Sequence, residues 1–434
     1  MPVKKSLLCL VSLLLSPAAF SQAAVPVGTE SILVRSEEPA HSSLYTPSII
    51  RMDTGRLVAA YEIGDRRTPK DAPYAFVLTS DDGGKNWTRR GSARINHGRL
   101  FEAGKSLYYL GHERDLRIMR SDDTGETWSQ IFQLTRGQRW HQSACNVWYA
   151  RGNVYLVMER IVDDRIRSWP VGAAAPVLMR ASVDDDLTNW ESWTLADELA
   201  FQDIIPGYRE NDLEIDFTGL PFFPQSYPGR HSLANRRSMA PMGWLEANVV
   251  QILDPEHYWH DPNGRTFHLF LRAHTGGTGY AALAKVIENA DGSMTTSLEK
   301  VPSGKTALFL PFPGGHMRFH VLHDEPTRLY WMVGSQATDS MTRIEQLPAD
   351  RYDLPLNERN RLVLHFSKNM VDWCFAGLVA KGGGNKESRH YASMAVDGDD
   401  LVILSRSGDA EARTAHDGNL ITFHRVKDFR KLVY

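Results

Sequence analysis

Cysteine is scarce in this chain. Of the three cysteines, Cys9 lies in an N-terminal apolar run, which leaves only Cys145 and Cys374 for the rest of the protein. Two cysteines so far apart cannot hold a fold together, so its stability must come from a hydrophobic core. The sequence leaves open whether they form one disulfide or remain two buried thiols.

Patterns that bind metals are also missing. Neither His-Glu-x-x-His nor Cys-x-x-Cys occurs. On a strand His316 and His320 would share one face, whereas His323 would point away from it. Nothing therefore supports a zinc or calcium site, and we expect no required cofactor.

Charge of one sign is not in excess, and long apolar runs are absent. The 49 Lys and Arg nearly balance the 52 Asp and Glu, without an acidic or basic tail, so we expect no nucleic-acid partner. The run Leu7–Leu15 is too short to span a bilayer, so we expect no membrane span. Because Lys4 and Lys5 precede it and small residues follow, residues 1–23 read as a signal peptide. We therefore expect a secreted or periplasmic protein.

Two nearly identical stretches, "SDDGGKNW" and "SDDTGETW", organise the chain. They read Ser80-x-Asp82-x-Gly84-x-x-Trp87 and Ser121-x-Asp123-x-Gly125-x-x-Trp128. Weaker copies contain Ser182, Asp184, Asp186 and Trp190, and then Ser367, Asn369 and Trp373. The aspartates can accept hydrogen bonds from backbone N–H groups of their own turn, and the tryptophans can pack beneath it. We interpret the motif as structural.

A second element recurs before each copy, a strand, a tight turn and another strand. Six such units can be counted, five of them with a turn glycine: Gly55, Gly104, Gly152, Gly264 and Gly398. Each is followed by an outer hairpin, which predicts an all-β fold, a β-propeller of six four-stranded antiparallel blades. Residues 24–434 then form one domain, in which residues 31–36 close the ring and residues 198–242 are an irregular insertion.

The Ser-x-Asp-x-Gly-x-x-Trp turn is the Asp-box, and through it the chain resembles the sialidase-like propeller superfamily over nearly its whole mature length. We expect a site where the inner strands begin near the axis. These segments carry Tyr45 and Thr46, Asn96 and His97, Trp140 to Gln142, Trp244 to Asn248, His316 and Arg318, and Arg389 to Tyr391. Such side chains predict a polar, cationic pocket for an acidic sugar.

Sialidases clamp a carboxylate with three arginines, attack with a tyrosine assisted by a glutamate, and use an aspartate as acid. The resemblance implies Glu246 and Arg272 in "LEANVVQIL…FLR", Tyr391 in "HYASMAVDGDD", and Asp65 or Asp71 as the acid. The family's Arg-Ile-Pro is replaced by "Tyr45-Thr46-Pro47", so one arginine is missing.

Residues 137–201, from "GQRWHQSACNVW" to "LADELAF", resemble the propeller-fold ulvan lyases. That resemblance implies β-elimination on a uronic-acid polysaccharide and seven blades. The seventh would have to come from residues 198–242 or 335–366, where no hairpin is evident. His141 would be the base, unless it is a core histidine, and Tyr208 in the insertion the acid. The side chains expected around the carboxylate and the substrate are Arg230, Arg236, Arg237, Arg272, Asn248, His316, Arg318, His390 and Tyr391.

Three functions follow from these patterns. The leading hypothesis is a secreted polysaccharide lyase acting on a uronate-containing, ulvan-like polymer, with or without sulfate groups. The alternative is an exo-sialidase or related glycoside hydrolase that uses Tyr391, Glu246 and Asp71. The third is a glycan-binding propeller without catalysis. In each case the expected partner is an acidic polysaccharide or oligosaccharide, and we expect a monomer.

Overall fold

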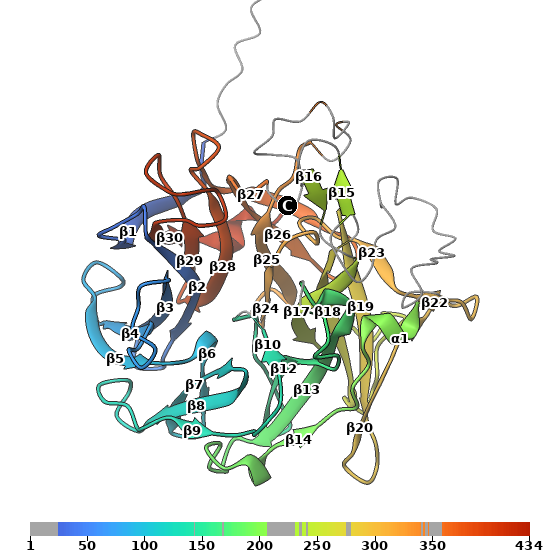
Figure 1. Ribbon diagram of the computed structural model, residues 1–434. Coiled ribbons are helices and arrows are strands. Elements are labelled where there is room, and N and C mark those ends of the chain that lie inside the picture. The colour runs from blue at the N-terminus through green and yellow to red at the C-terminus, as the bar shows by residue number, and fades with distance from the viewer. Residues whose placement is uncertain are drawn as a thin grey trace, which may run out of the picture.

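Six antiparallel sheets stand around a central axis, so the chain folds as a β-propeller (Figure 1). The structure is a computed structural model that describes residues 25–434 except 143, 167–168, 206–230, 234–236, 240–241, 275–278, 340–341, 343–345 and 347–357. Six blades are found in this part of the chain, which confirms the repeat count, and the seventh blade implied by the lyase resemblance is not among them. The predicted signal peptide lies outside the described residues.

Each blade runs from an inner strand at the axis to an outer strand at the rim. The first three blades are β2 (Ser42–Arg51), β3 (Leu57–Asp65), β4 (Ala75–Ser80) and β5 (Thr88–Ala93); β6 (Asn96–Ala103), β7 (Ser106–Glu113), β8 (Asp115–Ser121) and β9 (Phe132–Gln133); and β10 (Trp140–His141) with β11 (Trp148–Ala150), β12 (Asn153–Ile161), β13 (Ala174–Ser182) and β14 (Thr194–Leu195). The last three are β17 (Gly243–Val250), β18 (Thr266–His274), β19 (Tyr280–Glu288) and β20 (Met294–Ser297); β24 (His320–Asp324), β25 (Leu329–Ser335), β26 (Arg361–Ser367) and β27 (Cys374–Lys381); and β28 (Arg389–Asp397), β29 (Asp400–Ser407), β30 (Leu420–Val426) and β1 (Gly28–Arg35).

Shorter elements connect or extend the blades. They are β23 (Phe309–Pro311), which pairs with β19; the two-stranded pairs β15 (His231–Leu233) with β16 (Arg237–Met239) and β21 (Glu299–Lys300) with β22 (Thr306–Ala307); α1 (Phe201–Ile204); and 3₁₀ turns at Val171–Ala173, Trp190–Ser192 and Phe429–Leu432. No helix in the described ranges is long and apolar enough to cross a membrane.

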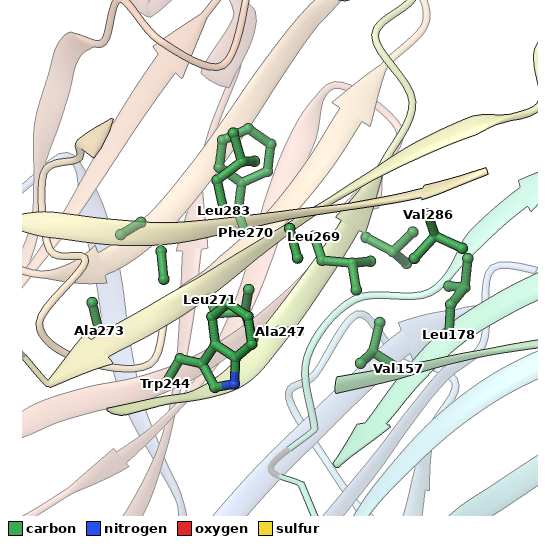
Figure 2. Close-up of a cluster of buried hydrophobic side chains, with 14 of the residues drawn as sticks. Val157, Leu178, Trp244, Ala247, Leu269, Phe270, Leu271, Ala273, Leu283 and Val286 are labelled. Carbon is green, nitrogen blue, oxygen red and sulfur yellow. The ribbon is translucent and has the colours of Figure 1, made fainter. Parts of the chain in front are cut away.

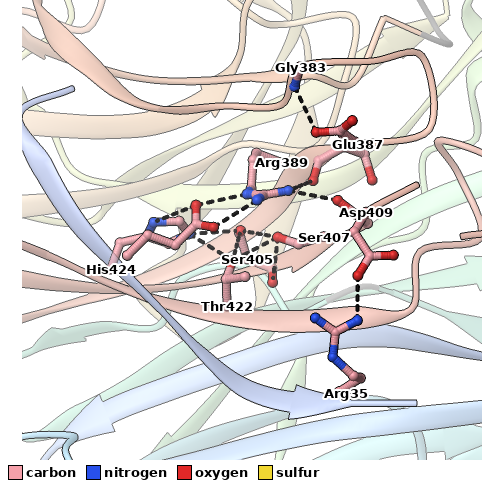
Figure 3. A network of polar contacts seen from close by, with 12 residues as sticks. Arg35, Gly383, Glu387, Arg389, Ser405, Ser407, Asp409, Thr422 and His424 are labelled. Carbon is pink, nitrogen blue, oxygen red and sulfur yellow. Dashed lines mark hydrogen bonds and ion pairs between the residues drawn. The ribbon is translucent and has the colours of Figure 1, made fainter. Parts of the chain in front are cut away.

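The ring is closed by the N-terminal strand. β1 pairs with β30 and becomes the outer strand of the last blade, as residues 31–36 predict. Arg389 donates two hydrogen bonds, of 2.8 and 2.7 Å, to Glu30, and Arg35 forms an ion pair with Asp409 (Figure 3). Closure therefore joins the two ends of the domain by both a β-ladder and ion pairs, which removes two exposed strand edges.

A buried polar network lies beside these ion pairs. The Nε2 atom of His424 is 3.1 Å from the hydroxyl of Ser405, and its Nδ1 atom is 3.7 Å from Glu30 (Figure 3). Ser405 and His424 are both fully buried in the sheet. The order of side chains is that of a nucleophile, a base and an acid, but no substrate can reach the serine, so we interpret the network as structural.

The two strong turn motifs have the structural role that the sequence predicts. The hydroxyl of Ser80 donates to Asp82 and accepts from the N–H of Gly84, while Asp82 also accepts the N–H of Asn86 at 2.9 Å. The second motif repeats this pattern around Asp123. In the third copy Trp190 packs half-buried against the core cluster, while the more deeply buried tryptophan is Trp193, whose indole donates to the carbonyl of Leu187. The extra residues of that turn bring a second tryptophan to the core.

The hydrophobic core lies between neighbouring blades. Figure 2 shows the contact between the third and fourth blades, where Val157 and Leu178 approach Leu269 and Val286. Trp244 is fully buried in the same cluster, and its indole donates a 2.7 Å hydrogen bond to Ala174 of the preceding blade. Because the sheets bury both faces, their strands carry long apolar runs.

Both described cysteines are free thiols. Cys145 is buried near the axis, and Cys374 is half-buried in β27. Of the two alternatives left open by the sequence, the disulfide is therefore wrong. The core between blades makes such a crosslink unnecessary.

Side chains near the axis tie each inner strand to the next. At five of the six blade interfaces a buried side chain accepts a backbone N–H of the neighbouring inner strand, at 2.8 to 3.3 Å. The acceptors are Ser48, Asn146, Asn248, His320 and Ser393. At the sixth interface, Arg99 donates to the carbonyl of Asn146 at 3.1 Å. This ring fixes the height at which the inner strands begin, and so the position of the site above it.

Candidate active site

Four inner strands bend where they reach the axis. Each has a β-bulge centred on a residue with positive φ: 38° at Thr46, 53° at His97, 58° at Glu246 and 51° at Tyr391. None of these is glycine, and such backbone strain gathers at functional sites. The bulge interrupts the alternation of the strand and turns these four side chains toward the axis.

The second strand of five blades carries, near its end, an ionisable side chain that pairs with the axial end of the inner strand. These residues are Glu62, His112, Glu159, Arg272 and Arg406, and all five are buried. Each lies seven or eight residues after the turn glycine of its hairpin. Of the five, the sequence reasoning identified only Arg272. The spacing from the glycine was the signal that could have found the others.

Two of these carboxylates hold the bulges of the next blade. Glu62 accepts the backbone N–H of His97, and Glu159 accepts that of Glu246. Burial raises the pKa of both carboxyl groups, that of Glu62 to about 8. We interpret both glutamates as positioning groups, because their carboxylate oxygens accept backbone N–H groups that the bulges would otherwise leave without a hydrogen bond.

Tyr391, Glu246 and Arg272 come together from three different strands. Arg272 donates a 2.5 Å hydrogen bond to the Tyr391 hydroxyl and a 3.2 Å one to Glu246, and the tyrosine and glutamate side chains are themselves hydrogen-bonded. Burial alone would raise the pKa of Glu246, but Arg272 and Arg318 lower it below its ordinary value. Burial raises the pKa of the Tyr391 hydroxyl. A neutral phenol therefore faces an ionised carboxylate.

Four guanidinium groups surround the Tyr391 ring. Their Cζ atoms lie 5.4 to 5.9 Å from its centroid, and the residues are Arg272, Arg318, Arg359 and Arg406, all buried. Sequence analysis missed Arg359 and Arg406. Arg406 lies 4.1 Å above the ring of Tyr45, the residue that stands where the resemblance expects an arginine. A guanidinium from β29 of the last blade therefore lies beside this residue of the first blade.

A pocket of about 430 Å³ opens beside this cluster. Glu246, Tyr391 and Arg406 form one part of its wall, and it extends across the first blade to His141 and Trp169. Its volume lies within the range of pockets that enclose small ligands.

The two aspartates proposed as the acid differ in position. Asp65 lines the pocket, but hydrogen bonds from Arg67 lower its pKa to about 2, so it is ionised at neutral pH. Asp71 is exposed in the following loop and is not part of the pocket wall. Asp65 therefore presents no protonated carboxyl to a leaving group, and Asp71 does not reach the pocket wall.

Two histidines, His97 and His141, line the far end of the pocket, and His112 lies beside them. The Nδ1 atom of His141 is 3.0 Å from the buried carboxylate of Glu159. The imidazole of His141 lies 5.1 Å from that of His97 and 5.8 Å from that of His112, measured between ring centroids. His141 is therefore a pocket residue with a carboxylate partner, which suits an acid–base role.

No family model matches the chain, and no curated protein matches it in sequence. Solved structures match it in shape. Penicillium chrysogenum alpha-L-arabinanase, complexed with arabinobiose, matches over 94% of this chain and 100% of its own, with 12% identity and a TM-score of 0.50. A Hadza microbial sialidase matches over 89% of this chain and 66% of its own, with 14% identity and a TM-score of 0.50. Trypanosoma rangeli sialidase in complex with sialic acid matches over 94% and 60%, with 14% identity and a TM-score of 0.50.

The chain shares their fold. At these identities the likeness extends to the architecture and to nothing finer.

The remaining predicted residues fall into two groups. Asn248, His316, Arg318 and His390 are buried around or beneath the cluster and do not form the pocket wall. The amide of Asn248 is used between blades, Arg318 donates to the carbonyl of Tyr391, and Arg359 contacts His390. The second group is Tyr208, Arg230 and Arg236, which lie outside the described residues, together with Arg237, which is placed only as part of β16.

The described residues contain no group of three or more His, Cys, Asp or Glu side chains that could hold a metal ion. In that part of the chain His320 accepts the N–H of Met394, and His323 pairs with Glu325. His320 and His323 therefore have separate partners.

Proposed function

We propose that the protein is a glycoside hydrolase that removes a terminal sugar carrying a carboxylate. The observation that carries this proposal is the Tyr391–Glu246–Arg272 contact inside a ring of four buried guanidiniums. Arginine forks bind carboxylates in two-point geometry, and four of them beside one ionised glutamate leave an excess of positive charge. An anionic sugar compensates this excess of positive charge, whereas a neutral sugar leaves it uncompensated.

The proposed reaction has two displacements. The Tyr391 oxygen attacks the anomeric carbon while Glu246 accepts the phenolic proton, and the bond to the leaving oxygen breaks as that oxygen takes a proton from a water molecule in the pocket, which is later regained when the second water gives up its proton. Charge that develops on the phenolic oxygen is stabilised by Arg272, which already donates to it. Water then displaces the tyrosine from the same carbon and restores Glu246, so the configuration is retained.

Hydrolysis of fluorogenic glycosides tests the proposal. The panel contains the 4-methylumbelliferyl glycosides of N-acetylneuraminic acid and glucuronic acid, with the neutral galactoside and arabinofuranoside for comparison. We expect cleavage of an acidic member, and a loss of about a thousandfold or more in Tyr391→Phe. Tyr258→Phe, at an exposed tyrosine outside the pocket, is the matched control. Cleavage of neutral glycosides alone, or a fully active Tyr391→Phe, contradicts the assignment.

A second candidate is the uronate-specific lyase that the sequence favours. The observation that supports it is the His141–Glu159 pair on the pocket wall, since a histidine oriented by a carboxylate is a suitable base for a C5 proton. Incubation with ulvan and other uronate polymers then yields an unsaturated product, detected by its ultraviolet absorbance. If His141→Ala forms no unsaturated product while Tyr391→Phe still forms it, the result favours the lyase over the hydrolase.

The remaining expectations stay proposals. The signal peptide predicted over residues 1–23 supports the proposal that the protein acts in the periplasm or outside the cell. An acidic polysaccharide or oligosaccharide is the proposed partner, and a monomer the proposed state.

A further inference from the structure

The pocket has two chemically different ends. At one end Arg406, Glu246 and Tyr391 belong to the guanidinium-rich cluster. The other end, which we call the His–Trp corner, is formed by Tyr74, His97, His141 and Trp169. A sugar ring bound beside Tyr391 would leave this corner for the next residue of the glycan.

The guanidinium of Arg94, which lies over the ring of Tyr74 in the His–Trp corner, is paired with Glu113. Burial lowers the pKa of His97 well below its ordinary value and that of the adjacent His112 to about 3, so both imidazoles are neutral. Neutral imidazoles both donate and accept hydrogen bonds, as sugar hydroxyls do. The corner therefore suits an uncharged, hydroxyl-bearing ring better than a second anion.

Two buried polar atoms of this corner lack partners within the described residues. They are the Nδ1 atom of His97 and the hydroxyl of Tyr74, which belong to residues of the pocket wall. Buried polar groups are nearly always hydrogen-bonded, so such a pair indicates a group that arrives from outside. The backbone N–H of His97 is already held by Glu62, which fixes the ring in place.

An aromatic side chain stands at the mouth of the same corner. Trp169 is 36% exposed, and its indole meets the His141 imidazole edge to face, with centroids 5.5 Å apart. What distinguishes this aromatic is its place on the pocket wall, where an indole face can pack against the C–H face of a pyranose.

We propose that the His–Trp corner binds the uncharged sugar that leaves during hydrolysis, with Trp169 stacking on its ring and His97 bonding its hydroxyls. The inference rests on the proposed function, because it takes the Tyr391 end as the site of the acidic sugar. The substrate class is thereby narrowed to an acidic sugar linked to a neutral one.

Binding of neutral sugars tests the corner without catalysis. Lactose, methyl β-D-galactopyranoside and methyl β-D-glucopyranoside are titrated while tryptophan fluorescence and saturation-transfer NMR are recorded. We expect saturable binding of at least one sugar, weakened about tenfold or more in Trp169→Ala. His97→Asn is the second variant, because asparagine tolerates the positive φ at this position. Tyr258→Ala removes an exposed aromatic outside the pocket and should change nothing.

Kinetics separate this inference from the proposed function. Two glycosides of the same acidic sugar are compared, one with methanol and one with lactose as the leaving group. We expect Trp169→Ala to raise KM about tenfold for the lactose glycoside and to leave the methyl glycoside unchanged. Equal effects on both substrates, or no binding of any neutral sugar, overturn the inference while hydrolysis stands. Binding that depends on Trp169 without cleavage of any acidic glycoside supports the corner and rejects the hydrolase.

Discussion

Arg406→Met gives the sharpest test of the cationic end. Arg406 stacks 4.1 Å above Tyr45, contacts His416 and faces Tyr391 at 5.4 Å, and only 3% of its surface is exposed. Methionine fills a similar volume without the charge. The substitution therefore removes one of four guanidiniums and leaves the other three, with Glu246, in place.

The structure predicts that this substitution changes the stability of the empty protein little but strongly weakens the binding of an acidic sugar. Losing the stacked guanidinium costs about 1–2 kcal/mol, but relief of repulsion among four buried cations offsets it, so stability should change by less than about 1 kcal/mol. Losing one partner of a buried carboxylate costs about 2–4 kcal/mol, which is roughly a 30- to 700-fold loss of affinity for an acidic sugar.

Calorimetric titration with 2-deoxy-2,3-didehydro-N-acetylneuraminic acid and with glucuronate measures the affinity, and urea unfolding measures the stability. Arg425→Met is the control, because Arg425 lies in the same blade but pairs with Asp397 and Asp400 at its rim. The reasoning is refuted if Arg406→Met binds the acidic ligand within about threefold of the wild type, or if Arg425→Met weakens it equally.

Three further predictions concern the scaffold. Asn248→Ala should destabilise the fold by about 2–5 kcal/mol in urea unfolding, because the carbonyl of Phe319 and the N–H of Val321 lose their buried partner; a smaller loss contradicts the axial ring. A hydrogen bond from Thr127 lowers the pKa of Asp123 to about 2, so the stability it contributes is present above about pH 4 and is lost as the pH falls toward 2. Asp123→Asn should flatten that acid limb in thermal unfolding, and an unchanged slope contradicts this. Glu30→Gln should speed hydrogen exchange in β1 and β30 by weakening the bond to Arg389, whereas unchanged exchange means that the ladder alone closes the ring.

Much of the architecture could be read from local patterns. The turn glycines and the Asp82 and Asp123 motifs involve neighbours in sequence, so they predict hairpins and turns wherever they occur. Their number predicts six blades, and residues 31–36 predict the closure. The deeper burial of Trp193 than of Trp190 depends on how the turn packs, which spacing alone does not show.

The site was only partly accessible from the sequence. Glu246, Arg272 and Tyr391 were found through motifs, and the structure places them in contact. Arg359 and Arg406 were missed because neither belongs to an inner strand, and the strands that carry Tyr45 and Arg406 meet only when the ring closes.

The sequence by itself determined the repeating unit, the number of blades and the kind of side chain brought to the axis, because these follow from residues that are close along the chain. Only the tertiary structure decided which charges become neighbours. Blades far apart in sequence converge on one axis, where burial keeps Tyr391 and His97 neutral and the neighbouring guanidiniums of Arg272 and Arg318 keep Glu246 ionised.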